Sequence, residues 1–158
     1  MDALAQKLGE RLKTAGAKLV TAESCTGGWA AQVVTSVAGS SDWFERGFVT
    51  YSNDAKRELL GVREETLKKH GAVSEETARE MAQGALDRGR GTVALAVTGV
   101  AGPGGGSAAK PVGTVCFAWA SARSVRSETQ QFSGDRESVR RQSVIRALEG
   151  VLQHLDGG

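Results

Sequence analysis

The sequence predicts a single α/β domain with three layers, α/β/α, around a mixed, mostly parallel sheet. Segments with helical periodicity alternate with short runs of strand-forming residues along most of the chain. The run TVALAVTG (92–99) is continuously apolar, as expected of a central strand that is covered on both faces. Two further strand-like runs follow without a helix between them, which adds antiparallel strands. Residues 1–158 are long enough for one core, and we expect them to form this one domain.

The first part of the chain alternates helices and strands. Leu4, Leu8 and Leu12 share one face of a first helix, which should end near Gly16. The runs AKLVTAE and WFERGFVTYS are rich in strand-forming residues and predict two strands. The segments after them predict helices: TGGWAAQVVTSV (26–37), which AGSS ends, then NDAKRELLG (53–61) and VREETLKKHG (62–71).

The remaining residues predict a long helix, three strands and a final helix. Ser74 is the expected cap of a helix over residues 75–89, with an apolar stripe and acidic residues in its first turn, where the helix dipole favours them. After the central strand, VGTVCFAWA (112–120) and VRSETQQF (125–132) predict two strands joined as a hairpin or meander. A last helix should begin near Asp135 and bury one apolar stripe: Val144, Leu148, Val151, Leu152 and Leu155.

The charge balance and the cysteine count argue against several classes of protein. Lys and Arg number 20 and Asp and Glu 18, and a net charge of +2 gives no signal for a polyanion, so we expect no nucleic-acid partner. Two cysteines cannot supply a four-cysteine zinc site or a secreted disulfide scaffold, which favours a cytoplasmic protein. The N-terminus does not resemble a signal peptide, and no apolar run approaches the roughly 18 residues of a membrane span.

Residues with reactive side chains cluster where the predicted strands end. Ser24 follows the first strand, Tyr51 and Lys56 flank the turn after the second, and Thr98 lies near the end of the central strand. Ligands of open α/β sheets bind at the carboxyl ends of the strands. We therefore expect these four residues and the glycine-rich loop after Thr98 to form one site.

The stretch TAESCTGG places two candidate nucleophiles, Ser24 and Cys25, at a strand-to-helix junction. Gly27 and Gly28 would let a substrate approach the backbone, and amides at the helix start could hold a carboxylate, a phosphate or an oxyanion. From the residues alone, a helix cap is the commoner role for such a serine and a packed thiol for such a cysteine. Glu23 could cap the helix or orient the serine. The nucleophile therefore stays open at this point.

A lysine is the favoured base. His70 and His154 are the two histidines, neither lies in a motif, and both are expected at the surface. Lys56, if desolvated beside Tyr51, would have a lowered pKa and could accept the serine proton, although most helix lysines are exposed. His, Cys and acidic residues show no ligand spacing, so we predict chemistry without a metal ion.

The loop GVAGPGGGSAAKP (99–111) is unusually rich in glycine. Such a backbone can turn several N–H groups toward one anionic group. The loop lacks the Lys-Ser or Lys-Thr of a Walker A motif and does not match G-x-G-x-x-G. A mobile turn between two strands is an equal alternative. The glycines concerned are Gly99, Gly102, Gly104, Gly105 and Gly106.

Six stretches, taken together in their order, resemble the CinA C-terminal family from about Thr21 to Arg146. They are TAESCTGG, GSSDWFERGFVTYSNDAK, LLGV, HGAVSEETA, VTGVAGPGGGSAAKPVGTV and FSGDRESVRRQ. Within this family, the chain resembles the stand-alone nicotinamide-nucleotide amidohydrolases. The resemblance implies hydrolysis of nicotinamide mononucleotide (NMN) to nicotinic acid mononucleotide and ammonia, in pyridine nucleotide (NAD) recycling. It also implies a serine amidase that needs no metal ion or other cofactor, and a homodimer.

The resemblance assigns roles residue by residue. Ser24 takes the position of the nucleophile, Tyr51 and Lys56 those of the assisting tyrosine and lysine, and Thr98 that of a threonine after the central strand. The residues expected to bind substrate are Gly27, Gly28, Asn53, Gly99, Gly102, Gly104, Gly105, Arg136 and Arg140. The two arginines are phosphate or structural contacts, and backbone amides of the glycines are expected to stabilise the oxyanion.

Two alternatives remain open. A nucleotide-binding module linked to competence or DNA damage would bind pyridine nucleotide without releasing ammonia. An amidase for another carboxamide is suggested by YSN and TG, which superficially resemble elements of serine-lysine penicillin-interactive enzymes, although no S-x-x-K surrounds Ser24. Larger CinA proteins contain an additional N-terminal domain, which we do not expect here.

Overall fold

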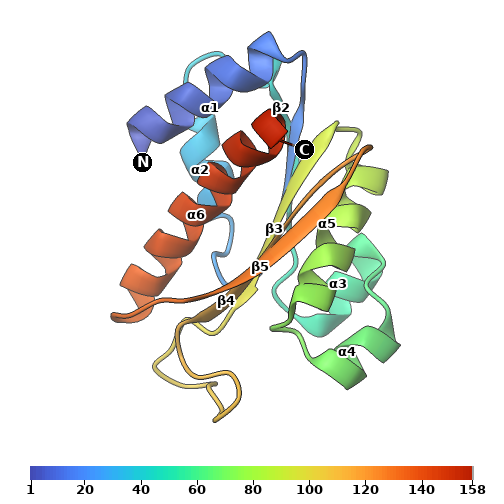
Figure 1. Ribbon diagram of the computed structural model, residues 1–158, viewed down its shortest axis with the longest axis vertical. Helices are drawn as coiled ribbons and strands as arrows, with labels where there is room; N and C mark the ends of the chain where they lie inside the picture. The colour runs from blue at the N-terminus through green and yellow to red at the C-terminus, as the bar shows by residue number, and fades with distance from the viewer. Residues whose placement is uncertain (158) are drawn as a thin grey trace.

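Five strands form one mixed sheet at the centre of the protein, whose computed structural model describes residues 1–157 (Figure 1). They are β1 (Leu19–Glu23), β2 (Phe44–Val49), β3 (Val93–Gly99), β4 (Thr114–Ser121) and β5 (Val125–Gln131). Their order across the sheet is β2-β1-β3-β4-β5. β1 pairs in parallel with β2 and β3, whereas β4 runs antiparallel to β3 and β5. Four strands therefore share one direction and β4 opposes them, which confirms the predicted mixed sheet.

Six α-helices in residues 1–157 cover both faces of the sheet and complete the three predicted layers (Figure 1). They are α1 (Asp2–Thr14), α2 (Trp29–Thr35), α3 (Asn53–Leu60), α4 (Glu64–His70), α5 (Glu75–Gly89) and α6 (Arg136–Gly157), and a 3₁₀ turn spans Ser40–Asp42. α1, α2 and α6 cover one face, and α3, α4 and α5 lie on the other. Every helix and strand that the sequence predicts is present in the predicted chain order.

The two faces of the sheet have side chains of different size. Large side chains pack toward α1, α2 and α6, and small ones toward α5: Leu19, Leu95, Phe117 and Trp119 on the first face, Ala22, Ala94, Ala96, Ala118 and Ala120 on the second. The alanines let α5 lie close to the sheet. A Cβ on Gly84 of α5 would lie 1.9 Å from the carbonyl oxygen of Leu60, so that only glycine fits there.

The segments that the sequence predicts to form the site lie together at the edge of the sheet where the parallel strands end. β1, β2 and β3 are parallel, and Glu23 of β1 pairs with Val49 and Val97, so these strands end side by side. β4 begins at the same edge because Val115 pairs with Gly99, and β5, antiparallel to β4, ends there. The glycine-rich loop and the start of α6 therefore reach this edge as well.

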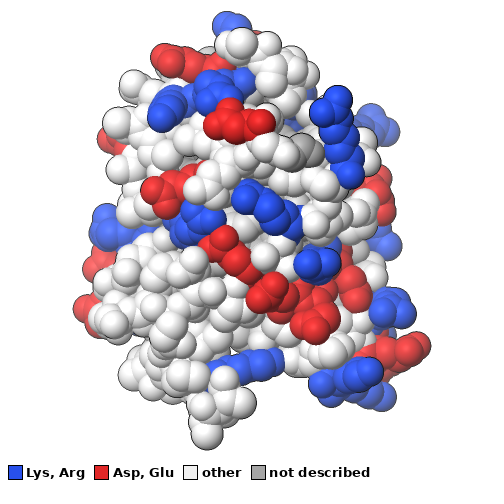
Figure 2. Space-filling view, viewed as in Figure 1, with Lys and Arg blue, Asp and Glu red and all other residues white. Residues whose placement is uncertain are grey.

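The surface has charges of both signs. Lys and Arg side chains are interspersed with Asp and Glu on the face shown in Figure 2, without an extended basic stripe. This pattern agrees with the small net charge of the chain. Within residues 1–157, no helix combines the length and the apolar character that crossing a membrane would require.

Candidate active site

A pocket of about 210 Å³ opens at the carboxyl edge of the sheet, among the ends of β1 and β3, the start of α3, the segment before α5 and the start of α6. Its lining residues are Ser24, Cys25, Tyr51, Asn53, Lys56, Ala72, Val73, Thr98, Gly99, Ala101 and Arg136. The structure therefore brings all four predicted catalytic residues to one pocket. Three of the predicted substrate-binding residues lie there too: Asn53, Gly99 and Arg136.

Ser24 begins a tight turn, residues 24–28, which we call the Ser24 loop and which leads from β1 into α2. The Gly27 N–H donates to the Ser24 carbonyl oxygen (3.0 Å) and closes this turn. Gly27 and Gly28 have φ angles of +61° and +103°, a left-handed conformation that favours glycine. The Ser24 hydroxyl bonds to groups of the pocket and to no amide of α2, so the helix-cap alternative for this serine is wrong.

Glu23 occupies the N-terminus of α2 with its fully buried carboxylate. Its Oε1 accepts from the Thr26 hydroxyl (2.6 Å) and the Ala30 N–H (2.8 Å), and its Oε2 accepts from the Ala31 N–H (3.1 Å). A carboxylate at this position satisfies amides that have no partner within the helix and interacts favourably with the helix dipole. The prediction that Glu23 could cap this helix is therefore confirmed, and the amides of Ala30 and Ala31 are occupied by the protein's own carboxylate.

Lys56 lies in the first turn of α3, which the Ser52 side chain caps, and its side chain is almost fully buried (1% exposed). The Lys56 Nζ lies 3.0 Å from the Ser24 Oγ. It also donates to the carbonyl oxygens of Thr50 (3.1 Å) and Tyr51 (3.0 Å). Burial lowers the pKa of Lys56 below its ordinary value, and no carboxylate of the described residues pairs with the amine. The site thus has an amine that is shifted toward its neutral form next to a serine hydroxyl.

Tyr51 contributes its main chain and its side chain to different parts of the pocket. Its carbonyl oxygen binds Lys56, whereas its side chain is 62% exposed and stands at the rim. Arg136 Nη2 donates to the Tyr51 hydroxyl (3.3 Å), and Arg136 Nη1 donates to the Gly102 carbonyl oxygen (2.8 Å). The Tyr51 hydroxyl therefore contacts an arginine of α6 rather than the Lys56 amine.

Thr98 is buried at the end of β3 and ties another segment to the sheet. Its hydroxyl donates to the carbonyl oxygen of Ala72 (2.9 Å), which lies between α4 and α5. Ala72 and Val73 consequently form one wall of the pocket. The sequence gives no reason to predict these two residues as part of the site, because small apolar side chains carry no chemical signal and only the folded chain places them beside Ser24.

Six of the predicted binding residues do not line the pocket: Gly27, Gly28, Gly102, Gly104, Gly105 and Arg140. Gly102 contributes its carbonyl oxygen to Arg136, as described above, whereas Gly104 and Gly105 are exposed farther along the loop. Arg140 lies behind the Ser24 loop, where it donates to the carbonyl oxygens of Cys25 (3.0 Å) and Thr26 (3.1 Å).

Cys25 and the two histidines offer no competing reactive group in the pocket. Burial raises the pKa of the Cys25 thiol to about 12, so this thiol is protonated at neutral pH. His154 is buried (3% exposed) and its Nε2 lies 3.1 Å from the Ser121 Oγ, so the expectation that it lies at the surface is wrong. His70 is half-buried and pairs with Glu76 (Nδ1 to Oε2, 3.4 Å). In residues 1–157, no three His, Cys, Asp or Glu side chains are grouped so that they could hold a metal ion.

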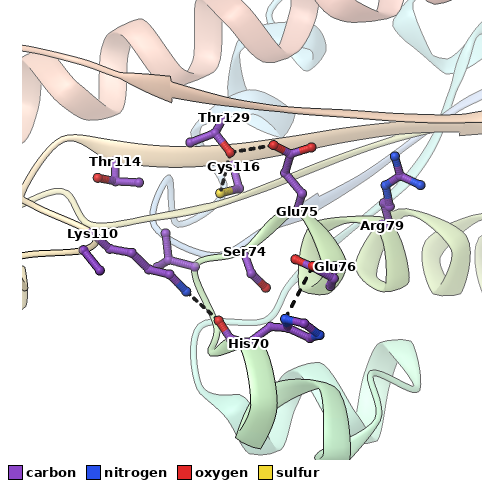
Figure 3. Close-up of a pocket in the computed structure, with 11 residues that line it drawn as sticks. His70, Ser74, Glu75, Glu76, Arg79, Lys110, Thr114, Cys116 and Thr129 are labelled. Atoms are coloured by element: carbon purple, nitrogen blue, oxygen red, sulfur yellow. Dashed lines mark hydrogen bonds and ion pairs between the residues drawn. The ribbon is translucent and has the colours of Figure 1, made fainter.

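A larger hollow of about 680 Å³ lies between α5 and the strands β4 and β5 (Figure 3). Its polar groups bond to one another: Thr129 donates to Glu75 (2.8 Å), His70 pairs with Glu76, and Lys110 donates to the His70 carbonyl oxygen. None of the predicted catalytic residues lines it. The smaller pocket, although less than a third of its volume, is therefore the candidate active site.

Comparisons with known proteins identify relatives of this chain in sequence and in structure. Residues 1–155 match the family model of the CinA C-terminal domain. The nicotinamide-nucleotide amidohydrolase PncC of Escherichia coli (strain K12) is 57% identical over 151 residues, which cover 95% of this chain and 92% of that protein. PncC of Pseudomonas putida is 55% identical over 150 residues, with coverages of 95% and 94%.

Solved structures share the fold. The competence/damage inducible protein CihA from Agrobacterium tumefaciens superposes with a TM-score of 0.94 at 48% identity, covering 98% of this chain and 94% of that chain. The CinA superfamily protein KP700603 from Klebsiella pneumoniae gives a TM-score of 0.96 at 38% identity, with coverages of 99% and 98%. With the family model matched over nearly its whole length, this chain belongs to the CinA C-terminal domain family.

Proposed function

We propose that this chain hydrolyses the carboxamide of NMN to nicotinic acid mononucleotide and ammonia, with Ser24 as the nucleophile and Lys56 as its base. The observation that supports this most is the 3.0 Å contact between the Ser24 Oγ and the buried Lys56 Nζ. The relatives named nicotinamide-nucleotide amidohydrolase, at 55 to 57% identity, support the choice of substrate.

The surroundings of Lys56 orient its lone pair toward Ser24. A neutral amine has two N–H groups and one lone pair. The carbonyl oxygens of Thr50 and Tyr51 can only accept, so each of them takes one N–H of the neutral amine. The remaining direction faces the Ser24 Oγ, whose proton the lone pair can then accept. The two carbonyls thus orient the base for deprotonation of the serine.

Acylation follows from this geometry. The Ser24 Oγ bonds to the carboxamide carbon of NMN while its proton moves to the Lys56 Nζ. The tetrahedral intermediate collapses as the carbon–nitrogen bond breaks, and Lys56 returns the proton to the leaving nitrogen, so that ammonia departs. The product of this half-reaction is an ester between the Ser24 Oγ and the nicotinoyl group of the nucleotide.

Deacylation uses the same base. Water adds to the ester carbon while Lys56 accepts a proton from it, and the bond between the carbon and the Ser24 Oγ then breaks. The proton on Lys56 returns to the serine oxygen. The new carboxylic acid loses its proton to solvent, nicotinic acid mononucleotide leaves as the carboxylate, and the free enzyme is restored.

Main-chain amides of the Ser24 loop are the candidate oxyanion donors. The N–H groups of Cys25 and Thr26 donate to no main-chain acceptor in residues 1–157, whereas the Gly27 N–H is engaged by the Ser24 carbonyl oxygen. Fixed amides next to a nucleophile stabilise the negative charge that develops on the substrate oxygen. We assign this role to the amides of Cys25 and Thr26.

The rim of the pocket suits the ribose phosphate. Arg136 lies there with its guanidinium between the Tyr51 hydroxyl and the Gly102 carbonyl oxygen. A guanidinium matches the geometry of a phosphate and binds it with two N–H groups. We propose that Arg136 binds the phosphate and that the exposed side chain of Asn53 contacts the ribose, while the carboxamide reaches Ser24 at the base of the pocket.

The cellular setting is part of the proposal. Both cysteines are free thiols, which favours a reducing compartment such as the cytoplasm. There the reaction would recycle pyridine nucleotide without a metal ion or other cofactor. We also propose a homodimer as the assembly, which analytical ultracentrifugation tests directly.

An ammonia-release assay on NMN, run in a chelator with wild type beside Ser24→Ala and Lys56→Ala, tests the function. We expect the wild type to produce nicotinic acid mononucleotide in the chelator and both variants to lose most of that activity. Binding of NMN without ammonia release would instead select a nucleotide-binding module. Loss of wild-type activity on chelation would contradict metal-independent chemistry.

A further inference from the structure

Arg140 of α6 makes a double contact with the Ser24 loop. Its Nε donates to the Cys25 carbonyl oxygen (3.0 Å) and its Nη2 donates to the Thr26 carbonyl oxygen (3.1 Å). The guanidinium also lies over the ring of Trp29 at the start of α2, 5.4 Å from the ring centroid. One side chain therefore holds two successive peptide groups of the Ser24 loop, Cys25–Thr26 and Thr26–Gly27.

These contacts determine where an amide of the loop points. In a planar trans peptide the C=O and the following N–H point in opposite directions. The Cys25 carbonyl faces Arg140 on α6, so the Thr26 N–H points away from the Arg140 guanidinium. The Cys25 carbonyl oxygen has no main-chain donor in residues 1–157, so Arg140 is the group that holds this peptide.

The same contacts argue against a direct role for Arg140 in binding phosphate. Its Nε and Nη2 face the carbonyl oxygens of the Ser24 loop, and the residue does not line the pocket. Arg136, one helical turn earlier on α6, does line it. The two arginines therefore have different surroundings although they lie on the same part of the helix.

We propose that Arg140 is a positioning residue, which holds the Cys25–Thr26 peptide so that the Thr26 N–H faces the substrate oxygen as negative charge develops on it. This proposal rests on the amidase function described above. Arg140 itself touches no substrate atom. Its effect is therefore on the chemical step, and it is the same whether or not the substrate has a phosphate.

The test compares Arg140→Gln and Arg140→Lys with Arg141→Gln as the matched control. Arg141 lies over the same Trp29 ring (5.2 Å) from the same helix, but it pairs with Glu137 and does not contact the Ser24 loop. The lysine variant keeps the positive charge but cannot form the bidentate hydrogen bonds of the guanidinium. The control thus removes an arginine and its ring contact without disturbing the loop carbonyls.

Kinetics on NMN and on nicotinamide riboside distinguish a positioning role of Arg140 from a direct contact with the substrate phosphate. Since loss of one oxyanion donor costs about 10²- to 10³-fold in kcat, we expect misplacement of one to lower kcat by about 10- to 100-fold in both Arg140 variants. KM for NMN should change little, and the rate on the riboside should fall by the same factor. A raised KM for NMN with unchanged kcat, and an unchanged rate on the riboside, would overturn the proposal in favour of a phosphate contact.

Hydrogen exchange provides a readout that does not depend on turnover. Peptides that contain residues 24–28 should exchange faster in Arg140→Gln than in the wild type and in Arg141→Gln, at equal global stability. Unchanged exchange in these peptides would overturn the proposal even if the wild type proves inactive on NMN. If the wild type releases no ammonia but exchange is faster in Arg140→Gln, the amidase function is contradicted. The conclusion that Arg140 holds the Ser24 loop would then still be supported.

Discussion

The amine of Lys56 lies 3.0 Å from the hydroxyl of Ser24 although 32 residues separate them in the chain. The contact exists because β1 and β2 are parallel neighbours, so the turn after each strand arrives at the same edge of the sheet. Burial keeps the pKa of the amine below its ordinary value, and two main-chain carbonyls take its other hydrogens. The fold therefore determines both the distance between Ser24 and Lys56 and the lowered pKa of the Lys56 amine.

The identity of the nucleophile predicts opposite results at neighbouring positions. Ser24→Ala should lower kcat on NMN by about four to six orders of magnitude, as found where a nucleophile is removed. Cys25→Ser should retain most activity, because burial keeps the Cys25 thiol protonated with a pKa of about 12. Ammonia release by both variants, measured with circular dichroism as a control for folding, checks the assignment. The reverse order of activities would identify Cys25 as the nucleophile.

The pH dependence of kcat/KM should report the Lys56 amine. In the proposed mechanism the neutral form of Lys56 is the base, so the rate should rise with pH and level off once the pH passes the pKa of Lys56. Burial lowers that pKa, so the plateau should begin below 10.5, the ordinary value for lysine. Lys56→Arg stays charged throughout this range and should be slow without a rising limb. A rising limb of the same position in Lys56→Arg would show that another group is the base.

The role of the Tyr51 side chain is tested by Tyr51→Phe. Lys56 contacts the main-chain oxygen of Tyr51, which this substitution keeps, and the lost hydroxyl contacts Arg136 at the rim. We therefore expect kcat to fall less than about tenfold and KM for NMN to rise, the pattern of lost substrate binding. Steady-state kinetics check this. A fall in kcat comparable to that of Lys56→Ala would mean that the hydroxyl takes part in proton transfer.

The buried carboxylate of Glu23 should stabilise the turn that presents Ser24. It accepts three hydrogen bonds at the start of α2, and Glu23→Gln would replace one acceptor oxygen with an NH₂ group that faces donors. A buried donor without an acceptor costs about 1 to 3 kcal/mol, so we expect the free energy of unfolding in urea to fall by about that amount. Glu10→Gln on the exposed side of α1 is the control, and equal stability of both variants would refute this role.

Local patterns in the sequence were sufficient to predict the elements of the fold. The leucines of α1, the apolar run of β3 and the caps of α3 and α5 gave helices and strands that the structure confirms in order. Ser24, Lys56 and Thr98 were placed together because each follows or ends a predicted strand. These predictions depend on short-range periodicity and on one general rule for parallel sheets.

Features that depend on side-chain direction and on helix packing could not be predicted in this way. His154 was expected at the surface, but the rotation of α6 against the sheet buries it beside Ser121. The Tyr51 hydroxyl contacts Arg136 rather than Lys56. The position of Tyr51 in the sequence, after a predicted strand, is compatible with either contact. Arg136 and Arg140 are four residues apart and the sequence predicts the same role for both, whereas Arg136 lines the pocket and Arg140 contacts the Ser24 loop from outside it.

The acyl-enzyme is the most direct test of the central claim, that Ser24 attacks the carboxamide of NMN with Lys56 as its base. Enzyme mixed with NMN is quenched in acid during turnover, digested, and mapped by mass spectrometry. We predict an acyl group of the nicotinoyl nucleotide on Ser24 in the wild type and none in Ser24→Ala, which should also release no ammonia. An adduct on Cys25, or ammonia release by Ser24→Ala at the wild-type rate, would contradict the account.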